Sequence, residues 1–315
     1  MVEAWWRLRG ELAGEMLHVI TARRAGRLVA VAPLAVTWRY GLRFLRWVGS
    51  DVFDYCDILA ADERASSALW RAIHRCGGFD LALIKTVQAG TATNRWLAQS
   101  AKHVRSTPTF AVRLSELHSA PWLRWSSDAR FRKKTRRLVQ KGVRYEVLRA
   151  GPVPERVFTA LISQKTAWAA RQKRVGLCND PEAAGVILRG IAEGFARAGV
   201  LHLSWLECDE GIIAVHLGCV HAGRLYYFMK SYDAAWSPLS PGAHLLAANL
   251  VWSAAHGLNE VDFLRGSEGY KAKIANVRRS PGDFLFAGSL LGRLAQPVIH
   301  LVLSRSGHEL SAQAP

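Results

Sequence analysis

The sequence predicts a mixed α/β fold built from two similar halves. Residues 224–274 carry the clearest pattern: an aromatic and apolar strand, a loop with Pro238 and Pro241, a helix with one apolar face, and a further strand after Gly257. Proline removes a backbone donor and ends the strand, and the glycine closes the helix. A helix end, a glycine break and an apolar strand recur at residues 74–85. This similarity of pattern favours two related halves.

The first half begins with a predicted hairpin at residues 16–38, in which Gly26 occupies the turn. The elements expected after it are a strand at 44–48, an aspartate-rich loop at 49–57, a helix at 65–75, and strands at 81–84 and 109–114. The second half repeats the order, with paired strands expected at 201–206 and 212–220 before the strand that starts at Leu225.

Residues 130–144 lie between the halves and contain eight cations and no acidic residue. We expect a helix there, which either binds phosphate or a polyanion or forms a solvated basic face. Amphipathic helices are expected at 157–168 and 183–195. The predicted organisation is a domain at 1–125, a basic connecting helix at 126–150, a catalytic domain at 151–290 and a C-terminal tail at 291–315.

The composition predicts attraction to anionic partners. The 315 residues include 42 Lys and Arg against 25 Asp and Glu, a formal net charge of +17. Such a charge suits nucleic acid, an anionic membrane face or a phosphate-rich cofactor, although a generally arginine-rich proteome explains it equally well. Five scattered cysteines without a C-x-x-C pair predict neither a disulfide framework nor a metal site. The apolar stretch at 284–303 is broken by Arg293 and Pro297, so we expect no membrane span and a cytoplasmic location.

Several short motifs in order carry a resemblance to a known family. In the second half they are Lys165 with Trp168, Leu203-x-x-Leu206, Gly211-x-x-Ala214, Tyr232-Asp233, Ser240-Pro241-Gly242, Asp262-Phe263, and Gly266-x-Glu268-x-Tyr270-Lys271. In the first half they are RLVAVAPL and Asp54-Tyr55-x-Asp57. The chain thus resembles GNAT-superfamily acyltransferases of the cellulose-biosynthesis CelD type, which are similar to the Fem peptidyltransferases.

This resemblance implies two tandem GNAT-like domains. It also implies an N-acyltransferase that moves an acyl group, such as acetyl, from acyl-CoA to an amine of a sugar, a polysaccharide precursor or a small metabolite. The usual GNAT diphosphate loop, Gln/Arg-x-x-Gly-x-Gly/Ala, is replaced by residues 240–244. Fem-like relatives take an aminoacyl group from tRNA, so tRNA is an alternative donor. A non-catalytic scaffold in exopolysaccharide biosynthesis and peripheral membrane association also stay open, whereas no DNA partner is expected.

A donor site is predicted on the strand and helix of residues 224–255. The strand containing Phe228, Met229 and Lys230 offers its backbone to the amide-bearing arm of the donor. The helix N-terminus offers backbone N–H groups to the diphosphate. The residues expected at that N-terminus are Ser240, Pro241, Gly242, Ala243 and His244. Ser240 could equally serve only as a helix cap.

Four residues are candidates for the chemistry of acyl transfer. Lys271 is expected near the oxyanion or a phosphate, against the alternative of a surface lysine. Glu268 is the expected general base, although its spacing also suits an ion pair with Lys271. Tyr270 could protonate a leaving thiolate or simply pack as an aromatic residue. Asp233, at the end of the strand, ranks behind Glu268 as a base.

Other polar residues have simpler interpretations. Asp262 is expected to orient the loop at Gly266 or to act as an acid or base, and His216 is interpreted as a core histidine. Aspartates 51, 54 and 57 either recognise the acceptor or cap turns. The chain has no Gly-x-Ser-x-Gly motif and no zinc-ligand spacing, so neither a nucleophilic enzyme nor a metal centre is predicted.

Overall fold

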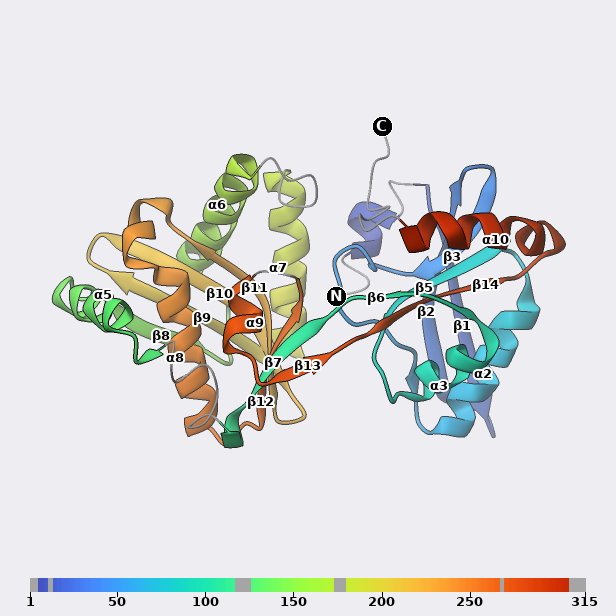
Figure 1. Ribbon diagram of the computed structural model, residues 1–315, viewed down its shortest axis with the longest axis horizontal. Coiled ribbons are helices and arrows are strands. Elements are labelled where there is room, and N and C mark those ends of the chain that lie inside the picture. The colour runs from blue at the N-terminus through green and yellow to red at the C-terminus, as the bar shows by residue number, and fades with distance from the viewer. Residues whose placement is uncertain (1–4, 11–13, 117–125, 173–179, 267–268, 306–315) are drawn as a thin grey trace. The chain divides into compact units, whose positions relative to one another are not determined.

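The structure is a computed structural model that describes residues 5–10, 14–116, 126–172, 180–266 and 269–305. Its Cα positions divide the chain into two compact units, each described here by itself. The N-terminal unit consists of Val2–Pro108 and Arg279–Pro315, and the central unit of Thr109–Arg278. Each unit is built on one β-sheet with helices on both faces (Figure 1).

The N-terminal unit contains most of the first half and the end of the chain. Its helices and strands are η1 (Trp6–Gly10), β1 (Met16–Arg24), β2 (Arg27–Arg39), β3 (Leu42–Trp47), β4 (Leu59–Ala60), α2 (Glu63–Cys76), β5 (Leu81–Val87), α3 (Ala92–Ser100), β6 (Lys102–Ser106), β14 (Gly282–Ala287) and α10 (Leu290–Arg305). The sheet runs in the order β1-β2-β3-β5-β14-β6, and β4 pairs with β2. β3 and β5 are parallel, whereas β1 with β2 and β2 with β3 are antiparallel.

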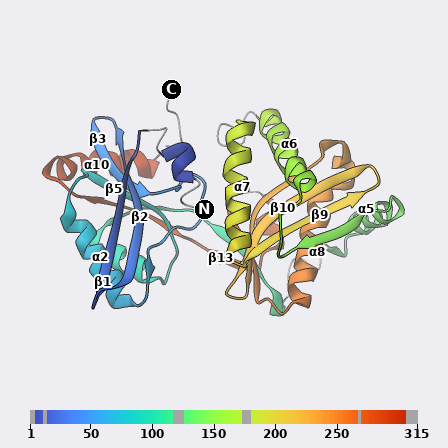
Figure 2. The same ribbon diagram turned by 180° about the vertical axis from the view of Figure 1, so that it is seen from behind.

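Two helices cover one face of this sheet and α10 covers the other. Helix α2 begins where Asp62 accepts a hydrogen bond from the Ala65 amide, and it buries Trp70 against Trp47 and Phe286. The tryptophan and phenylalanine rings form the centre of this core, which α3 completes. On the opposite face, Leu303 of α10 packs in a smaller core with residues of β3, β5, β6 and β14. Figure 2 shows the unit from behind.

The central unit contains the second half. Its elements are β7 (Thr109–Arg113), η2 (Leu114–Glu116), α5 (Ala129–Gln140), β8 (Arg144–Leu148), α6 (Glu155–Arg171), α7 (Pro181–Arg197), β9 (Leu201–Cys208), β10 (Gly211–His221), β11 (Arg224–Tyr232), η4 (Ala234–Leu239), α8 (Pro241–Ala255), β12 (Glu260–Arg265), α9 (Gly269–Ile274) and β13 (Val277–Arg279). The sheet runs in the order β13-β7-β12-β11-β10-β9-β8. Helix α8 packs Leu246 and Leu250 on one face, and α6 packs Val157 and Leu161 on the other.

The two sheets repeat one topology, which confirms the predicted mixed α/β class with two similar halves. In each, three antiparallel strands lead through a helix, α2 or α8, to a fourth strand that lies parallel to the third. The far side of each fourth strand pairs with a strand contributed by the other half of the chain: β14 beside β5 and β7 beside β12. Because of this exchange, the division after Pro108 and Arg278 differs from the expected domain limits at residues 125 and 290.

Two expected segments are corrected. The basic helix expected over residues 126–150 is α5, which ends at Gln140. Gly142, with φ +70°, then turns the chain into β8, because the backbone groups of the next residues pair with the edge of β9. The expected tail at 291–315 contains α10. Among the described residues, no helix combines the length and the apolar character needed to cross a bilayer.

Candidate active site

The strands β11 and β12 separate partway along their length. Their pairing covers Arg224–Tyr226 and Glu260–Asp262 and ends there. Beyond this point β12 bends, because Leu264 adopts φ +59° while its amide donates a hydrogen bond to Asp262 Oδ1 at 2.8 Å. In the described part of the chain, no strand pairs with that side of β11 after Tyr226. Over residues 229–232, β11 therefore pairs with β10 on one side, and its other side is a strand edge of the kind to which an extended chain can add.

A pocket of about 270 Å³ lies at this opening. Three elements line it: β11, the short helix α9 and the helix α6. The lining residues are Lys165, Trp168, Tyr227, Phe228, Lys230, Ser231, Tyr232, Tyr270 and Lys271. A volume of this size suits the reacting end of a substrate rather than a whole cofactor.

Three lysines give the pocket a positive character. Lys271 is only 4% exposed, and its Nζ donates to the carbonyl oxygen of Arg265 at 2.6 Å. Lys230 Nζ lies 3.6 Å from the centre of the Tyr270 ring, and Lys165 Nζ lies 4.1 Å from the centre of the Trp168 ring. Ammonium groups held at an enclosed surface stabilise negative charge more strongly than in water. The pocket is therefore suited to a carbonyl oxygen that becomes an oxyanion.

Only some of the predicted site residues lie in this pocket. Lys271, Tyr270, Phe228 and Lys230 come together in this pocket. Met229 packs instead among the apolar residues beneath α6. Asp233 caps η4, where its Oδ1 accepts from the Ala235 amide at 2.9 Å. Glu268 lies outside the described residues, so its role as a base stays a prediction.

The N-terminus of α8 is more enclosed than the sequence predicts. Pro241 and Gly242 are buried, and the amides of Ala243 and His244 donate to the Ser240 carbonyl at 3.0 and 3.2 Å. Two of the N–H groups expected to face a diphosphate are thus already hydrogen-bonded. A Cβ on Gly242 would lie 3.3 Å from Tyr232 Cδ1, so glycine permits this helix end to approach the side chain that lines the pocket.

The basic helix α5 supplies a cation at the same helix end. Ser240, with φ +54°, leaves its hydroxyl outside the helix, and Lys134 Nζ donates to that oxygen at 2.8 Å. Phe131 stacks on His244 with ring centres 4.2 Å apart, and Thr135 Oγ1 lies 3.0 Å from His244 Nε2. Burial lowers the pKa of His244. An ammonium group therefore adds to the positive end of the α8 dipole, which favours an anion there.

A buried polar cluster lies behind the pocket. His216 is fully buried and stacks on Tyr227 at 3.9 Å between ring centres, which confirms its interpretation as a core histidine. Ser204 Oγ donates to Asn249 Oδ1 at 2.9 Å and lies 3.4 Å from His216 Nδ1. Burial holds the pKa of His216 well below its usual range, and burial lowers the pKa of the neighbouring His202 to about 3. The His216 ring packs on Tyr227 of β11, and the His202 ring packs on His216 from the other direction.

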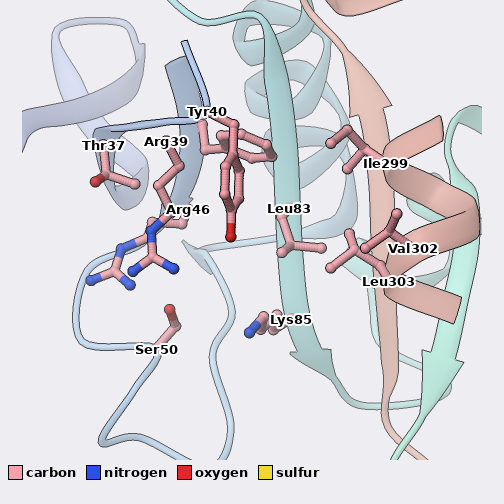
Figure 3. A pocket seen from close by; sticks show the side chains of 11 residues that line it. Thr37, Arg39, Tyr40, Arg46, Ser50, Leu83, Lys85, Ile299, Val302 and Leu303 are labelled. Carbon is pink, nitrogen blue, oxygen red and sulfur yellow. The ribbon is translucent and has the colours of Figure 1, made fainter. Parts of the chain in front are cut away.

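The N-terminal unit has a smaller pocket, of about 110 Å³, at the corresponding strands β3 and β5 (Figure 3). Arg46 and Lys85 lie on one side of it, and Ile299 and Leu303 of α10 on the other (Figure 3). The aspartate-rich loop, residues 49–57, reaches this pocket through Ser50. Asp57 accepts hydrogen bonds from the Thr93 hydroxyl and from its neighbour's amide, as a turn residue does.

Comparisons with known proteins agree with this geometry. A sequence model of the acetyltransferase (GNAT) domain family matches residues 126–272. The structure of FemX is similar at a TM-score of 0.61 and 13% identity, over 93% of this chain and 93% of that one. The structure of L-PGS from Bacillus licheniformis is similar at a TM-score of 0.59 and 12% identity, over 96% and 95%. No curated protein sequence matches.

These similarities bear on the fold. The central unit has the fold of GNAT-type acyltransferases, and both structural neighbours share the fold along nearly the whole chain. At such low identity they carry no information on the substrate. These matches do not distinguish the expected CelD type from other GNAT-type acyltransferases.

Sequence reasoning missed two contributors to the site. Lys134 was grouped with the other cations of the basic segment, although its position on the same face as Phe131 distinguishes it from the exposed ones. Gln164 was not singled out; its side chain accepts from Ser231 Oγ at 2.9 Å and donates to the Ile212 carbonyl, which ties α6 to the sheet beside the pocket. A lysine paired with an aromatic residue at helical spacing was the signal available in each helix.

Proposed function

We propose that the central unit transfers an acyl group from acyl-CoA to an amine. One observation carries this proposal: among the described residues no strand pairs with the β12 side of β11 after Tyr226, and a pocket lined by three lysines lies beside this edge. The pantetheine arm of acyl-CoA has amide groups that suit such a strand edge. The match of residues 126–272 to the acetyltransferase (GNAT) domain supports the same reaction type.

The rest of the donor fits the surrounding groups. With the arm along residues 227–230, the diphosphate would reach toward α8, whose N-terminus touches the pocket through Tyr232. Because the Ala243 and His244 amides are already hydrogen-bonded, we assign most of the attraction for phosphate to Lys134 and to the helix dipole. This shifts the expected phosphate contact from backbone amides to a side chain of α5.

The reaction needs a base, an oxyanion partner and an acid. The amine nitrogen attacks the thioester carbonyl, its proton passes to a carboxylate, and the carbon–sulfur bond breaks as the tetrahedral oxyanion collapses. We assign the oxyanion to Lys271, whose ammonium is already held by the Arg265 carbonyl. Glu268 is the proposed base, and the Tyr270 hydroxyl is the proposed donor to the thiolate. Asp233 is the less suitable base because its carboxylate caps η4.

A donor titration and a coupled thiol assay test this function. We expect acetyl-CoA or a longer acyl-CoA to bind in calorimetry and to release free thiol when amino sugars are added. The Lys271→Ala variant should lose thiol release, while Lys273→Ala, on the exposed side of the same helix, should not. A folded protein that binds no acyl-CoA in a screen of chain lengths would refute the proposal. The acceptor proposed is the amine of a sugar, a polysaccharide precursor or a small metabolite.

A second candidate donor is aminoacyl-tRNA, in line with the resemblance to Fem peptidyltransferases. The observation in its favour is the exposed cationic surface of α5, which carries Arg130, Arg132, Lys133, Arg136 and Arg137. Such a surface suits a polyphosphate backbone. Tight binding of tRNA that weakens steeply with salt, together with transfer that stops without tRNA, would favour this donor. Acyl transfer from acyl-CoA in the absence of tRNA would show that aminoacyl-tRNA is not required as the donor.

A further inference from the structure

The helix α10 is held against the N-terminal sheet by its polar residues. Gln296 Nε2 donates to the Leu285 carbonyl at 3.0 Å, and His300 Nε2 donates to the His103 carbonyl at 2.8 Å. At the first turn, a Cβ on Gly292 would lie 1.7 Å from the Asp80 carbonyl oxygen, so this face of the helix touches the backbone. These contacts fix the rotation of α10 about its own axis.

The same contacts leave an apolar face directed outward. This face, the α10 stripe, consists of Leu290, Leu291, Leu294, Val298 and Leu301. Leu290 is 76% exposed, Leu294 79% and Val298 64%. A helix on the surface of a globular unit normally turns its polar residues outward. In α10 the inner face packs Ala295, Ile299 and Leu303 against the sheet, and the outer face is apolar as well. A contiguous apolar surface of this kind marks an interaction site.

The charges around the α10 stripe indicate its partner. The chain has no Asp or Glu between residues 284 and 305, whereas Arg293 and Arg305 are exposed on α10. A second copy of the chain packed on this helix would bring its own arginines against these two, which is unfavourable. An anionic surface meets the same cations with attraction.

An exposed tyrosine next to α10 agrees with a membrane interface. Tyr40, 75% exposed in the turn between β2 and β3, lines the same small pocket as Ile299 and Val302 of α10 (Figure 3). Tyrosine and tryptophan concentrate at the level of lipid headgroups, where leucines on one helix face enter the acyl region.

We propose that the N-terminal unit binds the surface of an anionic lipid bilayer, with the α10 stripe inserted and Tyr40 at the headgroup level. The helix lies in the plane of the interface and does not span the bilayer. This inference concerns a binding surface and stands independently of the proposed acyl transfer.

Vesicle flotation of the full chain tests the proposal. The protein should float with vesicles of phosphatidylcholine and phosphatidylglycerol, float poorly with phosphatidylcholine alone, and lose binding as salt rises. The triple variant Leu290→Ser, Leu294→Ser, Val298→Ser should lower the partition by roughly tenfold or more, because apolar burial is removed. The double variant Leu28→Ser, Leu59→Ser changes residues that are equally exposed in the same unit, and it should bind as wild type does.

Two further readouts separate the alternatives. A tryptophan introduced into the stripe by Leu294→Trp should have its fluorescence quenched by brominated lipids, whereas one introduced by Leu59→Trp should not. Absence of flotation, or unchanged flotation of a folded triple variant, would overturn the proposal. Sedimentation that shows a wild-type dimer, a monomeric triple variant and no vesicle binding would assign the stripe to a second copy. Binding that appears only after removal of residues 306–315 would assign it to that segment instead.

Discussion

In both sheets the third and fourth strands separate because the fourth strand bends. The side chains that occupy the resulting opening differ between the two units. β3 and β5 pair over Phe44–Leu45 and Leu81–Ala82 and then separate, as β11 and β12 do after Tyr226. Thr86 in β5 has φ +58° and Leu264 in β12 has φ +59°, so both fourth strands bend through a left-handed residue. Each bend is secured by an aspartate that accepts the amide of that residue.

The N-terminal opening is filled by the protein itself. Trp47 Nε1 donates to the Lys85 carbonyl at 3.2 Å, which places an indole across the gap. In the central unit, no described strand pairs with β11 on the side of the corresponding gap. The space left is about 110 Å³, against about 270 Å³ in the central unit. A repeated topology therefore supplies an opening in both units, and side chains decide which one admits a ligand.

The largest effect is expected from Trp47→Ala. The side chain is 1% exposed in the main core, so its loss should lower the free energy of unfolding by about 3–5 kcal/mol. Urea denaturation measures this. Trp47→Phe should cost less, because it keeps most of the buried ring and loses the hydrogen bond. Equal stability of the alanine variant and the wild type would contradict the view that Trp47 closes the N-terminal opening.

Lys271→Ala should lower kcat for acyl transfer by about 10²–10³-fold with little change in donor affinity, because the ammonium acts on the oxyanion. Steady-state kinetics and calorimetry separate the two quantities. Its matched control is Lys85→Ala, which removes the lysine that lines the N-terminal opening and should leave kcat unchanged. A variant with full kcat would remove Lys271 from the chemistry.

Mild acid should destabilise the central unit before the N-terminal unit. His202 has a pKa of about 3 in the folded chain against an ordinary value of 6.5, so below pH 6.5 the unfolded chain binds more protons. Stability is complete above that pH and falls as the pH drops toward 3, by about 2 kcal/mol at pH 5 from this group. Urea denaturation at several pH values measures the slope. His202→Leu should flatten it; an unchanged slope would show that other groups dominate.

The smallest effect is expected from Lys134→Ala. Removing the ammonium at the N-terminus of α8 should raise KM for acyl-CoA by about two- to fivefold at low salt, with kcat unchanged. The exposed Lys133 provides the control, since its alanine variant should leave KM unaltered. If both variants raise KM equally, the whole cationic face of α5, rather than one placed lysine, attracts the donor.

The sequence pattern predicts many of the strands and helices, but it does not predict which of them pack against one another. The hairpin at residues 16–38, the helix that follows Pro241 and the strand at 261–264 all form where alternation, proline and glycine predict them. Lys271 and Tyr270, candidates from the family resemblance, both line the pocket, and their roles stay predictions. The enclosure of α8 was not, because the contacts of Lys134 and Phe131 with residues 240–244 join segments more than 100 residues apart.

The sequence by itself determined most strands and helices of residues 16–84 and 201–264, the repeated order of the halves and the positive charge, because these depend on neighbouring residues and composition. Only the tertiary structure decided that β7 and β14 exchange sheets, that Trp47 fills one opening while lysines line the other, and that α10 turns its leucines outward. Pairing of strand edges and burial of side chains are long-range choices. They are settled by which distant surfaces meet, and no local pattern records them.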